Sequence, residues 1–415
     1  GYIGHSALRT YTMGERAFEQ EASEDEVKHM QALVKEAMHA GAIGFSTSRT
    51  FNHTTADDKP VASRLANWEE VRAIVNAVGE TGKGIFEIAG EAPGRSPERN
   101  REYHDRLRDL AVESGVTQTW GMFSVKAAPD IWRPYFDLLD ETAAAGGRMF
   151  AQVHTRGLNN ILSFESATPY DNWELWSDIR ALPLKEQKAR MSDPATKAKL
   201  VEIANREYTG PRIVGAEIRP PDWEYVFPMD DMSYDKPSMA QIARDKGVNP
   251  VELMIDMALE KDLKMFFRTP IANENQDHVL EMIKHPRSVV TFSDSGAHVS
   301  QIMDSSLQTH LLSYWVREKE ALTLEEAVKQ ITYNTATLWG LHDRGLLREG
   351  MAADIVVFDP DTVGPDMPEV LNDLPAGARR LKQTATGILN TVVNGEIFLT
   401  NNEHSGATSG RLLRS

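Results

Sequence analysis

The feature that most constrains the fold is a repeated order in which an amphipathic helix is followed by a short apolar strand. In the first unit, Ser23 and Glu26 form a capping-box pattern, apolar residues recur at helical spacing as far as Gly41, and an apolar run occupies 42–46. The order repeats three more times, with strands expected at 85–88, 118–125 and 149–154. Four successive helix–strand units predict an α/β fold with a parallel sheet.

Outside these units the chain changes character. The opening 1–4 reads as a short strand that begins abruptly, which suggests a fragment, a processed chain or one subunit of a split enzyme. Residues 170–284 have a looser rhythm with scattered Pro and Trp, so we expect an insertion or lid there. Further strands are expected at 288–292, 353–359 and 389–396, and the last of these closes in an Asn-Gly turn.

Composition narrows the classes of function. The 415 residues suffice for one large domain and one small one, and the formal net charge of -16 argues against nucleic acid, whose binding needs clustered Lys and Arg. No apolar run reaches the roughly 18 residues that cross a membrane. With Cys 0, a metal ion would have to be held by His, Asp, Glu or a modified Lys, and a cytoplasmic location is favoured.

The strongest candidate chemistry follows the strand expected at 288–292. Asp294 and His298 lie just beyond this strand, where barrel enzymes place their active sites. A carboxylate in this position can bind zinc and accept a proton from the metal-bound water. The alternative is an Asx turn, in which Asp294 bonds the backbone near Gly296.

Two histidines at other strand ends are further candidates. His154 ends the strand at 149–154 and is a candidate for catalysis and for metal binding, and His5 has the same standing for catalysis. A single histidine at a strand end is more often an ordinary polar residue. Arg156 follows His154 and is assigned, with His298, to substrate binding.

Charged residues after two more strands complete the candidate set. Arg49 and His53 are predicted to bind a substrate carboxylate, since the arginine fork matches that group, or else to order the loop that follows. Glu87 and Glu91 flank a strand end. Glu87 is either a metal ligand or the partner of a Lys, whereas Glu91 is expected only to form such a pair.

Several blocks of the sequence resemble the N-acyl-D-amino-acid deacylase (D-aminoacylase-like) branch of the amidohydrolase superfamily. The most specific block runs through 335–359 and is similar to the passage that returns from the barrel to the β-sandwich in that superfamily. The resemblance covers essentially the whole chain. The other similar blocks lie at 4–9, 41–49, 293–298 and 406–413.

The resemblance implies a distorted (β/α)8 TIM-like barrel, of which this chain would supply strands 3 to 8, with a small β-sandwich at the C-terminal end. The implied domains are 1–345, an incomplete barrel with its insertion or lid near 170–284, and 346–415, a β-sandwich portion with the C-terminal tail. The strand-8 Asp of the family corresponds to Asp294.

The same resemblance implies a metal site that this chain does not complete. The family's first-strand His-x-His pair and a following Cys ligand have no counterpart here, and the expected strands at 85–88 and 118–125 lack the His that better-known members carry. We therefore expect one or two zinc ions, held by Asp294 with His154 and Glu87 as possible ligands and otherwise by residues outside this chain. The implied partner is a complementary N-terminal chain or segment within a higher oligomer.

The function that the resemblance implies is hydrolysis of an amide bond, in an N-acyl amino acid or a cyclic amide, by zinc-activated water. Asp294 would accept the proton of the water, while His5, His154 or His298 polarises the carbonyl. Two alternatives remain open. In the first, the chain is a non-catalytic barrel subunit or binding module that has lost its metal. In the second, the leaving atom is oxygen and the substrate is a lactone or ester.

Overall fold

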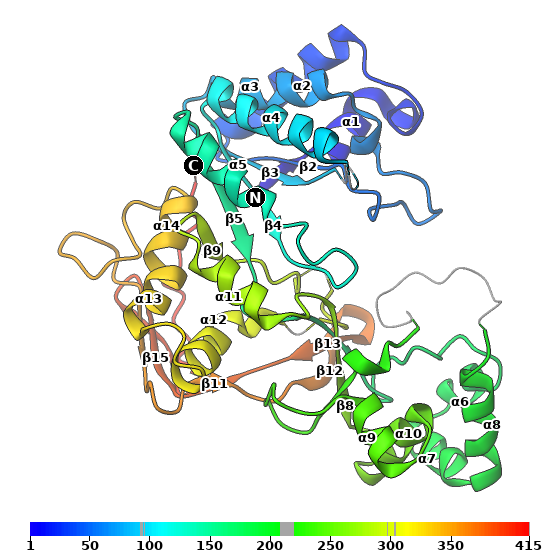
Figure 1. The fold of residues 1–415 in the computed structure, drawn as a ribbon. Coiled ribbons are helices and arrows are strands. Elements are labelled where there is room, and N and C mark those ends of the chain that lie inside the picture. The colour runs from blue at the N-terminus through cyan, green and yellow to red at the C-terminus, as the bar shows by residue number, and fades with distance from the viewer. Residues whose placement is uncertain (92–93, 95, 208–219, 297, 303, 415) are drawn as a thin grey trace.

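A six-stranded parallel sheet forms the centre of the N-terminal part in the computed structural model, which describes residues 1–91, 94, 96–207, 220–296, 298–302 and 304–414 (Figure 1). The strands follow the order β1-β2-β3-β4-β5-β9, and every neighbouring pair is parallel. The predicted α/β fold with a parallel sheet is confirmed. The strands are β1 (Tyr2–Gly4), β2 (Gly44–Ser48), β3 (Ile85–Ala89), β4 (Thr117–Met122), β5 (Met149–Val153) and β9 (Ser288–Val290).

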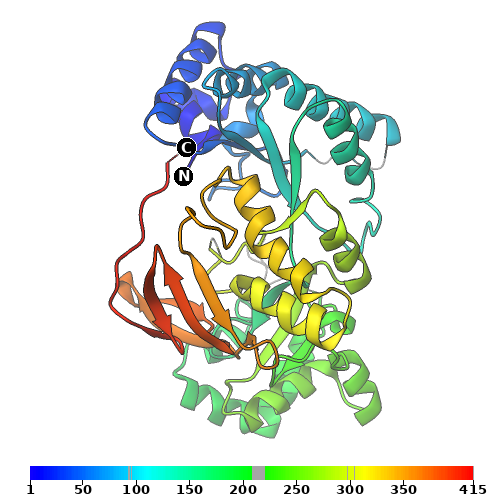
Figure 2. The ribbon, with the colours of Figure 1, turned by 90° about the vertical axis from the view of Figure 1, so that its left-hand side faces the viewer.

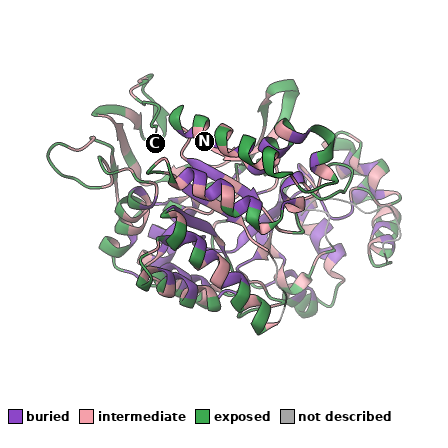
Figure 3. Cartoon of the chain, turned by 90° about the horizontal axis from the view of Figure 1, so that it is seen from above, coloured by how far each residue is buried: buried purple, intermediate pink, exposed green. Residues whose placement is uncertain are grey.

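Helices cover one face of this sheet. The apolar side chains on that face, such as Phe45, Phe86 and Val153, belong to one buried core shared with the helices. Seen from above, the strands are buried while the covering helices turn exposed faces outward (Figure 3). The capping box of Ser23 and Glu26 opens α2 as predicted. The helices are α1 (His5–Met13), α2 (Glu24–His39), α3 (Trp68–Gly79), α4 (Pro97–Ser114), α5 (Pro134–Ala144) and α11 (Gln276–Lys284).

The opposite face of the sheet is more polar and less buried. Ser46, Ser48 and Glu87 on this face are half-buried, whereas their strand neighbours on the helix-covered face are buried. Within the described residues, β1 pairs with β2 alone and β9 with β5 alone. The sheet is therefore open at both edges in this part of the chain, and the closed eight-stranded barrel stays a prediction.

The segment between β5 and β9 has a hydrophobic core of its own. An antiparallel sheet of order β6-β8-β7 consists of β6 (Leu158–Leu162), β8 (Phe266–Ala272) and β7 (Phe227–Met229). A helical cluster packs beside it around buried residues that include Trp176 and Met254. The helices are α6 (Trp176–Arg180), α7 (Leu184–Ser192), α8 (Pro194–Ala204), α9 (Met239–Lys246) and α10 (Pro250–Glu260). This separate core begins at β6, and the insertion or lid expected near 170–284 stays a prediction.

The helices that follow β9 are wound unevenly. Two segments, η5 (Leu311–Glu318) and η6 (Gln330–Asn334), have π-helical geometry, which is often found near functional sites. The neighbouring α-helical segments are α12 (Leu307–His310), α13 (Leu324–Lys329) and α14 (Thr335–Leu338). Short 3-10 turns occur at Gly14–Phe18, Ala62–Leu65, Trp223–Tyr225, Asp304–Ser306 and Pro375–Gly377. None of the helices in the described ranges has the length and apolarity that a membrane span requires.

The C-terminal part consists of small antiparallel sheets. The predicted hairpin turn is present, because Asn394 and Gly395 have φ values of 48° and 86° between β15 and β16. The extended tail then crosses to the N-terminal part, where Arg414 donates a hydrogen bond to the carbonyl of Ala40 (Figure 2). The strands are β10 (Ile355–Phe358), β11 (Gly364–Pro365), β12 (Glu369–Leu374), β13 (Ala378–Lys382), β14 (Ala385–Thr386), β15 (Ile388–Val393), β16 (Glu396–Thr400) and β17 (Glu403–His404).

Candidate active site at the strand ends

Asp294 lies four residues beyond the end of β9, in a left-handed backbone conformation. Its φ is 58°, a value that Asp tolerates better than most residues. Residues in such uncommon conformations cluster at functional sites, so the loop is a candidate functional element. The carboxylate is 36% exposed, and its Oδ2 lies 3.7 Å from Nε2 of His298. Within the described residues no backbone amide donates to this carboxylate, so they do not form the alternative Asx turn. Asp294 and His298 together present an acid–base pair to solvent.

On the polar face of the sheet, a line of hydrogen bonds joins β3 and β5 to the residue that follows β9. Nε2 of Gln152 on β5 donates to Oε1 of Glu87 on β3 over 2.8 Å, and Oγ1 of Thr291 donates to Oε1 of Gln152 over 3.1 Å. Burial raises the pKa of Glu87, since its charged form is poorly solvated there. Glu87 therefore has an amide partner, and the line ends three residues before Asp294.

His154 and Arg156 lie deeper than the sequence suggests. His154 is fully buried, and its Nδ1 accepts a hydrogen bond from the backbone amide of Arg156 over 3.1 Å. Burial, and secondarily the charge of Arg156, lower the pKa of His154 well below its ordinary value. The guanidinium of Arg156 is also buried and donates to Oγ of Ser306 over 2.8 Å. Both predicted site residues thus belong to the interior beyond β5.

Arg49 and His53 hold the loop between β2 and α3. Arg49 forms an ion pair with Glu91 at 3.1 Å and donates to the carbonyl groups of Ser63, at 3.3 Å, and Ala66. Nδ1 of His53 lies 2.6 Å from Oγ of Ser48. These contacts match the alternative in which the two residues order the loop. Glu91 also pairs with an arginine of α4, as its expected structural role requires.

His5 is engaged on the helix-covered face. Its Nδ1 lies 2.8 Å from Oγ1 of Thr47, and its Nε2 lies 2.9 Å from Oε1 of Glu70 on α3. The other oxygen of Glu70 accepts a hydrogen bond from Arg9. All four of these charged or polar side chains are buried. The geometry ties His5 to a structural network and does not bring it to Asp294.

A protein-bound zinc ion needs three or four converging His, Cys, Asp or Glu side chains. The described residues contain no group of three or more such side chains that could hold a metal ion. The predicted set of Asp294, His154 and Glu87 is therefore not brought together. Asp294 and His298 are two donors, which are too few to hold zinc alone, so the described residues do not by themselves fit the expected metal.

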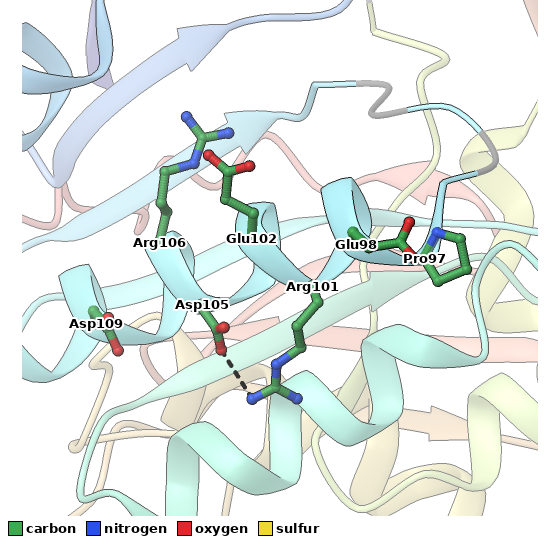
Figure 4. A pocket seen from close by; sticks show the side chains of 7 residues that line it. All are labelled: Pro97, Glu98, Arg101, Glu102, Asp105, Arg106 and Asp109. Atoms are coloured by element: carbon green, nitrogen blue, oxygen red, sulfur yellow. Dashed lines mark ion pairs between the residues drawn. The ribbon is translucent and has the colours of Figure 1, made fainter.

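The main surface hollow does not identify the active site either. A shallow hollow of about 690 Å³ lies along α4 on the outer helical layer (Figure 4). Arg101 and Asp105 form an ion pair at 2.8 Å within it. It contains none of the predicted site residues. The lining residues are Pro97, Glu98, Arg101, Glu102, Asp105, Arg106 and Asp109.

Sequence reasoning missed Gln152, which connects Glu87 to Thr291. Its signal is a polar amide inside an otherwise apolar strand, a position where a buried partner is required. Sequence reasoning also missed Arg268 and His310, which lie in the interior beside His154 and Arg156. No local pattern marks these two, because they lie on β8 and α12, which are far apart in the sequence.

Comparisons with known proteins agree with this fold. Residues 228–398 match the model of the amidohydrolase family. The chain is 33% identical over 125 residues to N-acyl-D-aspartate deacylase of Alcaligenes xylosoxydans xylosoxydans, covering 30% of this chain and 21% of that protein. It is 24% identical over 419 residues to D-aminoacylase of the same organism, covering 99% of this chain and 69% of the relative. The matched part is thus only a fraction of the length of each relative.

Solved structures with the same fold include two deacylases. A D-aminoacylase studied for its binuclear metal center matches with a TM-score of 0.60 and 19% identity, covering 100% of this chain and 71% of that chain. N-acyl-D-glutamate deacylase from Bordetella bronchiseptica, complexed with zinc and a phosphonate inhibitor, matches with a TM-score of 0.59, 18% identity and the same coverage. Over residues 228–398 the chain is similar to the amidohydrolase family. The match that extends over 99% of the chain is to a D-aminoacylase.

Proposed function

We propose that this chain takes part in hydrolysing the amide bond of an N-acyl amino acid or a cyclic amide. Asp294 carries the proposal: a half-exposed carboxylate on a strand-end loop, held in a left-handed conformation beside His298. The family and the deacylase names of the relatives support amide substrates. A lactone or ester would differ only in its leaving atom.

Asp294 is assigned the proton transfers of this reaction. Its carboxylate accepts a proton from the attacking water and delivers it to the leaving nitrogen, which otherwise departs as a strong base. His298, 3.7 Å away, orients the carboxylate and donates a hydrogen bond to the substrate oxygen. No step is assigned to a metal ion, because two donors are fewer than a catalytic zinc site needs.

The direct test is Asp294→Asn, measured as the initial rate of hydrolysis of N-acetylated D- and L-amino acids. The substitution keeps the shape and the tolerance for a left-handed backbone but removes the base, so we expect a rate loss of at least about 100-fold. The matched control is Asp373→Asn, an exposed carboxylate on β12. Near-normal activity of Asp294→Asn contradicts the proposal, and a wild-type chain without any hydrolysis in its native assembly favours the binding-module alternative.

We further propose that a complementary polypeptide segment adds strands to the open edges of the parallel sheet. In the described part of the chain, the outer edges of β1 and β9 are unpaired, and unpaired edges invite further strands. The small sheet also leaves Val356 and Ile397 half exposed, at 53% each, which favours a second layer over it. Such a segment would also bring additional metal-binding side chains to the loop of Asp294.

Hydrogen exchange tests this second proposal. We expect the backbone amides of β1 and β9 to exchange quickly in the chain alone and to be protected in the assembly isolated from its native source. The central strand β4 is the internal control, because it is paired on both sides. Equal protection of the two edges in both samples contradicts the proposal.

A further inference from the structure

Arg268 is a buried guanidinium for which the described residues provide no carboxylate and no hydrogen-bond acceptor. It lies on β8 with 7% of its surface exposed. Its Cζ atom lies 3.8 Å from the ring centroid of Tyr234 and 4.8 Å from that of Phe227. The aromatic faces stabilise the charge from above, but the N–H donors in the guanidinium plane are left for another partner.

His310 lies against the same tyrosine. Its ring centroid is 4.8 Å from that of Tyr234 and 5.0 Å from that of Tyr314, on which it stacks. His310 is 2% exposed, and its buried Nε2 has no hydrogen-bond partner among the described residues. The hydroxyl of Tyr234 accepts a hydrogen bond from Asn159 over 2.8 Å, which holds the ring that contacts both Arg268 and His310.

Three side chains that can carry a positive charge lie near His310 in the described part of the chain. Burial, and then the nearby Arg156, His154 and Arg268, lower the pKa of His310 well below its ordinary value. The imidazole is therefore neutral and, with hydrogen on Nε2, is a donor. The described residues give Arg268 no carboxylate partner. A buried cation without an anionic partner is strongly unfavourable, so the guanidinium of Arg268 requires a negative charge beside it.

We propose that Arg268 and His310, brought together around Tyr234, form a binding site for a small organic carboxylate. The planar guanidinium matches a carboxylate in a bidentate arrangement, and Nε2 of His310 supplies one further donor. Phe227 and Tyr314 offer apolar contact to the remainder of such a molecule. The site does not depend on the proposed hydrolysis, although the carboxylate could come either from a free acid or from an N-acyl amino acid substrate.

The test measures acetate binding by titration calorimetry and thermal unfolding, at constant ionic strength maintained with sodium chloride. We expect acetate to raise the melting temperature of the wild-type chain in a saturable way. Arg268→Met keeps the length and apolar contact of the side chain but removes its charge, and should weaken acetate binding at least tenfold. Arg244→Met is the matched control, because Arg244 is exposed and paired with Glu224.

A second variant covers the case in which Arg268→Met does not fold. His310→Phe keeps a ring against Tyr234 and Tyr314 but removes the Nε2 donor, so acetate binding should weaken several-fold. Absence of a saturable acetate response in the wild type overturns the proposal, as does wild-type affinity in either variant. Acetate binding and thermal unfolding do not require substrate turnover, so their outcome does not depend on whether the proposed hydrolysis is correct.

The source of the carboxylate is then separated by competition. If N-acetylglycine displaces acetate while N-acetylglycinamide does not, the site recognises the carboxylate of an N-acyl amino acid. If acetate binds and N-acetylglycine does not compete, the site recognises a free small acid. Both results support a carboxylate site, whereas equal displacement by the uncharged amide overturns it.

Discussion

Gln152 on β5 reaches across β4 to donate a hydrogen bond to Glu87 on β3 over 2.8 Å. The reach is possible because the residue of β4 in register with Gln152 is Gly121, which has no side chain in the way. A Cβ at Gly121 would lie 2.5 Å from the ring of Phe292, so this position accommodates only glycine while that ring stays in place. The polar face of the sheet is thus shaped by one amide, one carboxyl and one glycine.

The raised pKa of Glu87 predicts a pH dependence of stability. Because its folded-state pKa lies above the ordinary value of 4.5, protonated Glu87 stabilises the fold at low pH. That contribution is lost as the pH rises from about 4.5 through the raised pKa. Glu87→Gln remains neutral, so its melting temperature relative to the wild type should increase between pH 4 and pH 8, measured by circular dichroism. Exposed Glu396→Gln is the control, and a difference that falls with pH contradicts the assignment.

The buried network of His5, Arg9 and Glu70 predicts a large loss of stability. Glu70→Gln leaves the guanidinium of Arg9 buried without its counter-charge, which should lower the free energy of unfolding by about 3–5 kcal/mol. Glu69→Gln, in the same helical turn but with a side chain 74% exposed, should change it by less than about 0.5 kcal/mol. Urea unfolding measures both. Equal effects of the two substitutions would show that the network contributes little.

Local patterns predicted most of the sheet and several turns. The capping box at Ser23 and Glu26 and the turn at Asn394 and Gly395 depend on residues a few positions apart, so the sequence contains the whole interaction. Apolar runs that come after amphipathic helices in the sequence predicted the parallel strands. The boundaries shifted by a few residues, because hydrogen bonding between strands and not apolarity defines where each strand ends.

The partners of the site residues could not be predicted in the same way. His5 follows a strand as a rim residue would, yet it turns to Thr47 and Glu70, which are 42 and 65 positions away. Whether a strand-end side chain points to the rim or into the helical layer depends on the exact register and on what packs there. The sequence identified the residue types and the strand ends, but these distant pairings decide which residues are available to a substrate.

The left-handed backbone at Asp294 predicts different tolerances at one position. Most residues with a Cβ are unfavourable at a φ near 58°, whereas Asp, Asn and Gly adopt it readily. Asp294→Ala should therefore lower the free energy of unfolding by about 1–2 kcal/mol, while Asp294→Asn and Asp294→Gly should stay within about 0.5 kcal/mol of the wild type. Denaturant titration of the three variants checks this. If alanine and asparagine give equal stability, the left-handed conformation is not a constraint.

The contacts of Arg49 predict that it orders a loop and does not bind substrate. Arg49→Met removes the hydrogen bonds to the carbonyl groups of Ser63 and Ala66 and the ion pair with Glu91. We expect limited proteolysis within residues 50–61 to become several-fold faster, because loops that lose their anchoring bonds open more often. The KM for an N-acyl amino acid should stay unchanged. Arg72→Met, on the exposed side of α3, is the control. A raised KM with unchanged proteolysis would instead assign Arg49 to the substrate carboxylate, since the bidentate fork would then be used by the ligand and not by Glu91.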